Sequence, residues 1–192
     1  MSVLLTVSLS ATLPLSAASH VDVVKMRTEN QVNPLGIGTS TPRFSWQITS
    51  DRKGVVQMSY QILVASSREK LDRNEADLWD SGERNSDEQL WIPYQGKALL
   101  SGAQAYWKVR ITTNKGKSEW TEPQLFTIGL LGETKWSGTW IGLEDLQPGE
   151  QKGMHTRLAA RYIRKDFAAK GKVKRAVAYV AGLGVYEFYV NG

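Results

Sequence analysis

The stretch "AYWKVRITTN", residues 105–114, decides the fold of this chain. Trp107, Val109 and Ile111 alternate with polar residues, so apolar and polar side chains would point to opposite faces of an extended backbone. The polar set is Lys108, Arg110 and Thr112. A period of two predicts a β-strand with one face in the core and the other in water. Such a half-buried sheet needs a second layer, so further strands are expected on both sides of this one.

Five other stretches have strand composition and are bounded by Gly, Pro, Asn or Ser. They are residues 21–26, "RFSWQI" (43–48), "VVQMSYQILVAS" (55–66), "EQLWIPY" (88–94) and "PQLFTIG" (123–129). Their predicted inward faces comprise Phe44, Trp46 and Ile48, then Met58, Tyr60, Ile62 and Val64, and finally Phe126 with Ile128. Pro93 indicates either an edge strand or a position at the end of its strand, because proline has no N–H to donate to a neighbouring strand.

These features predict an all-β chain whose residues 21–129 form an immunoglobulin-like antiparallel sandwich. The best helical candidate, "SREKLDRNEADLW" (67–79), is short and interrupted by Asn74. At most one short helix capped by Ser67 is expected there.

A second block follows this sandwich. Residues 130–159 are rich in glycine and polar residues and predict a linker pinned by Trp136 and Trp140. Residues 160–192 predict three more strands, at 161–167, 173–181 and 185–191. Three strands with one apolar face are marginal alone, and this block has no partner sheet within the chain. We expect the chain beyond about Gly142 to unfold partly or to associate.

Composition excludes several classes of function. The 192 residues carry a net charge of +5, but the basic residues are scattered and no docking element for nucleic acid accompanies them. The absence of cysteine excludes disulfides and Cys-ligated zinc, and His20 and His155 are the only histidines. No metal site, cofactor or membrane span is predicted. Residues 1–18, "MSVLLTVSLSATLPLSAA", predict a signal peptide and hence export to the periplasm or beyond.

No catalytic residue is predicted. The adjacent acids Asp87-Glu88 and Glu144-Asp145 lie in polar loops or strand starts, and neighbours on a strand face opposite sides. Glycoside hydrolysis needs two carboxylates facing one sugar. The one binding feature is aromatic, because an indole offers a plane on which a sugar can stack. Trp79, Trp91 and Trp120 are the candidates for sugar stacking, with a purely structural role as the alternative; Trp46 and Trp107 are assigned to the core.

Eight motifs in order resemble one family. They are "NPLGIGTSTPRFSWQI", "SYQILVASS", "LWDSGE", "AYWKVRITTNKGKSEWTEP", "LFTIGLL", "KWSGTWIG", "ARYIRKDF" and "AVAYVAGLGVYEFYVNG". Together they resemble the N-terminal region of the bacterial α-L-rhamnosidases of glycoside hydrolase family 78. The resemblance implies a fibronectin type III-like sandwich, then an incomplete jelly-roll-like β domain over residues 160–192.

In that family a later (α/α)6 barrel holds the catalytic acid and base and hydrolyses terminal α-L-rhamnosides with inversion. No position of this chain matches that barrel, so no catalytic residue is carried over. The implied partners are the remaining domains of the same polypeptide and, through the full-length enzyme, rhamnose-containing glycans. Two alternatives stay open: a stand-alone carbohydrate-binding module, and a sandwich that acts through protein contacts.

Overall fold

The computed structural model describes residues 21–132, 136–142, 146, 148–151, 153 and 159–191. The predicted signal peptide, both histidines and the Glu144-Asp145 pair lie outside these residues. The chain divides into two compact units, Met1–Ser137 and Gly138–Gly192. The division falls inside the predicted linker, residues 130–159.

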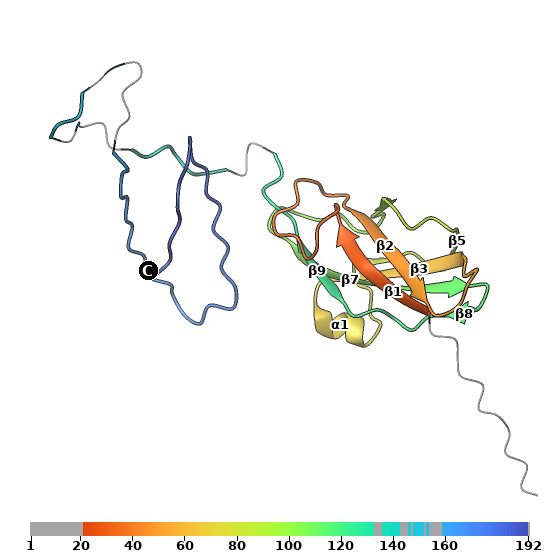
Figure 1. The fold of residues 1–192 in the computed structure, drawn as a ribbon. Coiled ribbons are helices and arrows are strands. Elements are labelled where there is room, and N and C mark those ends of the chain that lie inside the picture. Colours follow the sequence, from red (N-terminus) through yellow and green to blue (C-terminus); the bar gives the residue numbers. More distant parts are fainter. Residues whose placement is uncertain are drawn as a thin grey trace, which may run out of the picture. The chain divides into compact units, whose positions relative to one another are not determined.

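The first unit is a sandwich of two antiparallel sheets (Figure 1). The first sheet has the order β1-β2-β6, with β1 at Val21–Thr28, β2 at Arg43–Ser50 and β6 at Ile92–Pro93. The second is centred on the pair β3 (Gln57–Ala65) and β7 (Gln104–Thr113). Four short strands flank this pair: β4 (Trp79–Asp80) and β5 (Arg84–Asn85) beside β3, and β8 (Gly116–Lys117) and β9 (Gln124–Thr127) beside β7. The all-β prediction is confirmed.

The core lies between the two sheets and is centred on aromatic side chains. Phe44 of β2 is fully buried, with its ring centre 4.4 Å from that of Trp107 and 5.8 Å from that of Phe126 in the opposite sheet. Val109, Ile111 and Ile128 are also buried. The predicted inward faces of β2, β7 and the 123–129 stretch are therefore confirmed. Side chains of this size dominate the hydrophobic stabilisation of a small sandwich.

The second sheet is also covered on its outer face. Leu63 and Ala65 of β3 are buried there with Leu71 of the short helix α1 (Arg68–Asp72). The predicted cap is confirmed, because the Ser67 side chain accepts a hydrogen bond from the Lys70 N–H. Lys108, expected on the wet face of β7, is instead only 5% exposed. Its ammonium group donates to the Leu71 carbonyl at 2.5 Å and to Asn74 at 2.7 Å, which satisfies the C-terminal end of the helix.

The predicted inward position of Met58 is wrong. Tyr60, Ile62 and Val64 are buried as predicted, but Met58 is 58% exposed. The register between β3 and β7 shifts between Gln57 and Ser59. A bulge of this kind reverses the alternation for the residues before it. Gln57 consequently points inward and replaces Met58 as the buried side chain at this end of the strand.

The described residues of the second unit contain no assigned helix or strand. The three strands predicted at 161–167, 173–181 and 185–191 are therefore not formed in the structure. Their apolar side chains are exposed, including Phe167, Val185 and Tyr189. The physical reason is that a strand needs backbone partners and a covered face, and the described part of this unit supplies neither. The jelly-roll-like fold of this block stays a prediction.

Candidate binding site

Trp79, the first candidate for sugar stacking, belongs to the core. It lies in β4 and is 9% exposed. Its ring centre lies 6.4 Å from that of Phe44, with the rings stacked, and 5.5 Å from that of Tyr94, with the rings edge-to-face. The indole is thus covered by other aromatic rings, and we drop Trp79 from the sugar-stacking candidates. The predicted helical stretch, 67–79, ends at Trp79, and the two-residue strand β4 is too short to show the alternation that predicts a strand.

Trp120, the second candidate, is half-buried against the outer cluster of Leu63, Ala65 and Leu71. Two cations lie over its ring: the Lys108 ammonium at 5.1 Å and the Arg110 guanidinium at 4.4 Å from the ring centre. Such cation–π contacts are attractive and hold the indole in place. Trp120 therefore covers the outer face of the sheet beside α1, which is a structural role.

Trp91, the third candidate, is 42% exposed at the start of the edge strand β6. The Arg43 guanidinium lies 4.1 Å from the centre of its ring. Arg43 is in turn held by Glu29, with Nε 3.1 Å from Oε1 and Nη2 2.7 Å from Oε2. The structure thus joins three residues from three separate segments. Sequence analysis missed Arg43 and Glu29, because no local spacing links them to Trp91.

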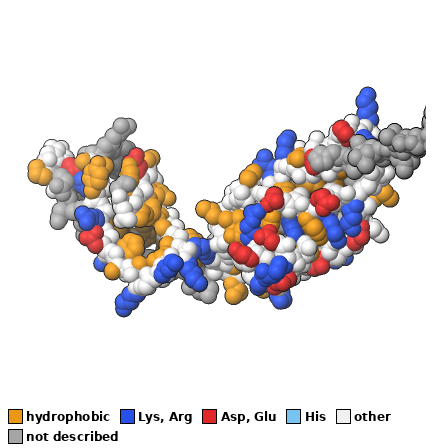
Figure 2. Space-filling model, turned by 90° about the horizontal axis from the view of Figure 1, so that it is seen from below, with side chains coloured by type: hydrophobic (Ala, Val, Ile, Leu, Met, Phe, Trp, Pro, Cys, Tyr) orange, Lys and Arg blue, Asp and Glu red, His pale blue; other side chains and the backbone are white. Residues whose placement is uncertain are grey.

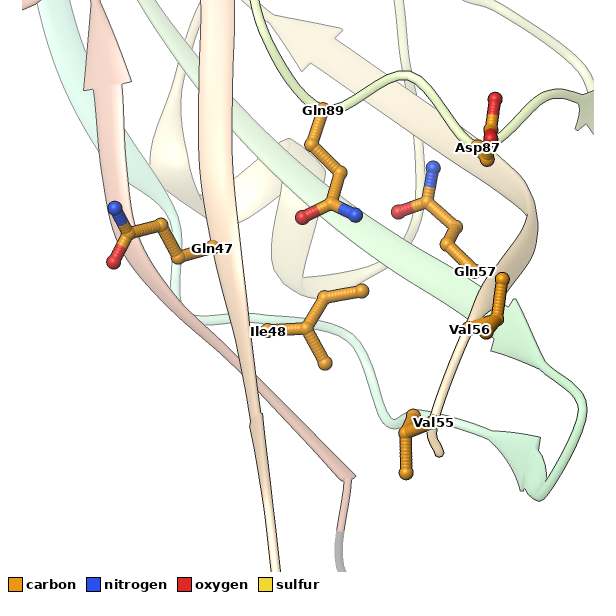
Figure 3. Close-up of a pocket in the computed structure, with 7 residues that line it drawn as sticks. All are labelled: Gln47, Ile48, Val55, Val56, Gln57, Asp87 and Gln89. Carbon is orange, nitrogen blue, oxygen red and sulfur yellow. The ribbon is translucent and has the colours of Figure 1, made fainter. Parts of the chain in front are cut away.

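An open depression of about 480 Å³ lies between β2, the start of β3 and the 87–89 loop (Figure 3). The Gln57 and Gln89 side chains point toward each other across it, whereas the Gln47 amide points away. Gln57 is fully engaged, since it accepts from the Trp46 indole N–H at 3.0 Å and donates to the carbonyls of Ser86 and Glu88. Its amide therefore anchors the loop and is not offered to a ligand.

Several carboxyl groups of the sandwich are stabilised in their ionised form. A general acid in glycoside hydrolysis needs a raised pKa. Within residues 21–132, the carboxyl groups whose pKa is shifted all have it lowered, namely Glu29, Glu69, Glu75, Asp77 and Glu83. Hydrogen bonding to Arg43 is the main cause for Glu29. Burial acts to raise the pKa of Asp77, but hydrogen bonds from Lys70 and Ser66 outweigh it and lower this pKa to about 2.

The described residues hold no candidate metal centre and no candidate membrane-spanning helix. Within that part of the chain, no three His, Cys, Asp or Glu side chains gather in a way that could hold a metal ion. None of its helices is long and apolar enough to cross a membrane. Acidic and basic side chains are interspersed on the face of the sandwich shown in Figure 2.

Comparison with known proteins agrees with this geometry. Residues 23–132 match the family described as the Rha78A-like, N-terminal immunoglobulin domain. The chain belongs to this family. The match runs from within β1 to beyond the end of β9, so the immunoglobulin-like prediction is confirmed for the first unit.

Relatives extend the similarity beyond the sandwich. An α-L-rhamnosidase of Formosa agariphila is 35% identical over 91% of this chain, and one of Alteromonas sp. is 36% identical over 85%. The crystal structure of Streptomyces avermitilis α-L-rhamnosidase complexed with L-rhamnose superposes with a TM-score of 0.61 at 36% identity. That superposition covers 64% of this chain and 12% of the other. The Rha78A-like chain spans only about a fifth of the length of its curated relatives.

Proposed function

We propose that this chain is the non-catalytic N-terminal region of an exported α-L-rhamnosidase that hydrolyses terminal α-L-rhamnosides with inversion. One observation carries the proposal: the α-L-rhamnosidase of Formosa agariphila aligns with 91% of this chain but with only 20% of its own length. The described sandwich adds support, because its shifted carboxyl groups all have lowered pKa values. The catalytic acid and base would then lie in the remaining domains of the same polypeptide.

The role of the sandwich in such an enzyme is support. Buried side chains from both sheets, many of them aromatic, pack together in one hydrophobic core. The first unit thus provides a rigid module beside the domains that act on rhamnose-containing glycans. Export follows from the leader at residues 1–18, which lies outside the described residues and stays a prediction.

The experiment extends the coding sequence past residue 192 in its own frame and assays the product. We expect an open frame of several hundred residues whose product releases rhamnose from an aryl α-L-rhamnoside, with inversion seen by NMR. A stop codon directly after residue 192, or release with retention, would contradict the proposal. The second candidate, a stand-alone carbohydrate-binding module, is favoured only by the exposed Trp91 indole and would gain from such a stop codon.

A further inference from the structure

Trp91 is held on the surface by a β-bulge at the edge of the first sheet. Phe44 pairs with Ile92, while the Trp46 N–H donates to the Gln89 carbonyl at 3.0 Å. The two steps from Phe44 to Trp46 on β2 therefore lie opposite the three steps from Ile92 to Gln89, so the opposing segment has one extra residue. Trp91 sits in this bulge with φ at 59°, a left-handed conformation that is rare for a bulky residue. Strain of this kind concentrates at functional positions.

The bulge leaves a backbone donor that a side chain satisfies. The Trp91 N–H donates to the Ser45 hydroxyl at 3.0 Å in place of a ladder bond. Ser45 is only 5% exposed, and this hydrogen bond is partly buried. The backbone of Trp91 is therefore held in place, which sets the direction in which its side chain leaves the strand.

The side chain is fixed a second time by the Arg43–Glu29 pair. Glu29 takes two N–H groups of the guanidinium and also the backbone N–H of Arg43, at 2.8 Å. The guanidinium then lies against the Trp91 ring. Trp91, Arg43 and Glu29 together are called the Trp91 platform. A guanidinium has five N–H donors and the Glu29 side chain engages two of them, so others can donate outward.

A structural explanation accounts for only part of this arrangement. Bulges and prolines blunt edge strands against pairing with other chains. Pro93 already removes a donor from this edge, and a blunted edge does not need an exposed indole. Here the indole is 42% exposed and the neighbouring Leu90 65% exposed, whereas Trp46, Trp79 and Trp107 of the same sandwich are buried. The backbone strain at Trp91, its partly buried hydrogen bond to Ser45 and the Arg43–Glu29 ion pair together keep one large aromatic plane in solvent.

We infer that the Trp91 platform is a sugar-binding subsite for a terminal 6-deoxyhexopyranose of the rhamnose type. The apolar face of the sugar, with its methyl group, would stack on the part of the indole that the Arg43 guanidinium leaves open, and a sugar hydroxyl group would accept from an outward N–H of Arg43. The choice of sugar rests on the proposed function; the site itself rests on the geometry. The subsite would hold the glycan at the module without reacting with it.

The test uses the 15N-labelled 192-residue chain titrated with methyl α-L-rhamnopyranoside. Its seven tryptophans give separate indole N–H signals, and Trp91→Phe identifies that of Trp91 by its loss. We expect a saturable shift of the Trp91 signal. Trp91→Ala is expected to weaken binding at least about tenfold. The matched control Trp120→Ala removes an indole that also lies under a guanidinium, and is expected to change binding less than about twofold.

A Trp91 signal that stays in place at saturating sugar, or wild-type affinity in Trp91→Ala, would overturn the subsite. Unmoved signals of the other six tryptophans in Trp91→Ala exclude unfolding as the cause of lost binding. Methyl β-D-glucopyranoside is titrated in parallel. A Trp91 shift with this sugar and none with the rhamnoside would overturn the choice of sugar. Failure of the proposed function is read separately, from the hydrolysis assay on the extended gene product.

Discussion

Gln57→Ala gives a sharp test of how the sandwich holds its 86–89 loop. Gln57 is 3% exposed and makes three hydrogen bonds, one from the Trp46 indole and two to the carbonyls of Ser86 and Glu88. Each contributes about 1 kcal/mol net, so their loss lowers the free energy of unfolding by about 3 kcal/mol. The Trp46 N–H is then left buried without a partner, which acts in the same direction.

The assay is urea unfolding of the 192-residue chain followed by tryptophan fluorescence. With an m value of about 1.5 kcal/mol/M, a loss of about 3 kcal/mol lowers the urea midpoint by roughly 2 M. The matched control is Gln61→Ala on the same strand, whose half-buried amide bonds Asp80 and Arg110 on the outer face. We expect the control to lose less than about 1 kcal/mol, since those groups can bond water instead.

A double-mutant cycle isolates the buried hydrogen bond. Trp46→Phe removes the indole donor, and its effect combined with Gln57→Ala gives the coupling between the two side chains. We expect a coupling of about 1 kcal/mol. Additive effects, or a loss for Gln57→Ala no greater than that for Gln61→Ala, would refute the claim that this amide holds the loop.

Three further predictions follow from other parts of the chain. Gly96→Ala places a Cβ 2.4 Å from the Leu78 carbonyl oxygen, and this overpacking destabilises the fold by about 1–3 kcal/mol, which lowers the melting temperature by at least about 4 °C. Gly38→Ala is the control, because its Cβ meets no atom within 4 Å. Equal melting temperatures for the two variants would contradict the close packing at Gly96. Asp77→Asn lowers the stability of the fold at neutral pH. The difference in urea midpoint between wild type and variant shrinks as pH falls from about 4 toward 2, because the folded-state pKa of Asp77, about 2, lies below the ordinary 3.8. A difference that stays constant down to pH 2 would count against the ion pair between Asp77 and Lys70. Limited proteolysis cuts within residues 159–191 before it cuts within 21–132, and protection of the former in a monomer would contradict their exposure.

The long strands could be predicted from sequence because each has a core face with period two. Trp107, Val109 and Ile111 in β7, and Phe44 and Trp46 in β2, are buried as the alternation predicts. The two-residue strands β4, β5 and β8 could not be predicted, since two residues define no period. The same reason explains why the burial of Trp79, in β4, could not be predicted.

Other misses depend on tertiary structure. Met58 points outward because a bulge shifts the register between β3 and β7, and no residue type at this position predicts that bulge. Lys108 is buried because helix α1 lies over it and its ammonium satisfies the helix end. Among the candidate site residues, Trp91 could be named from sequence as an aromatic near a loop. Its partners Arg43 and Glu29 could not, because strand pairing and a turn of left-handed residues bring them to it.

The most direct measurement of the central claim is hydrolysis of an aryl α-L-rhamnoside by the 192-residue chain alone, at high protein concentration. The shifted carboxyl groups of the sandwich have lowered pKa values, and we propose that the catalytic acid and base lie in other domains of the polypeptide. We therefore predict no release of the aryl group above the rate without protein. Clear turnover that co-purifies with the chain would contradict the claim that this region is non-catalytic.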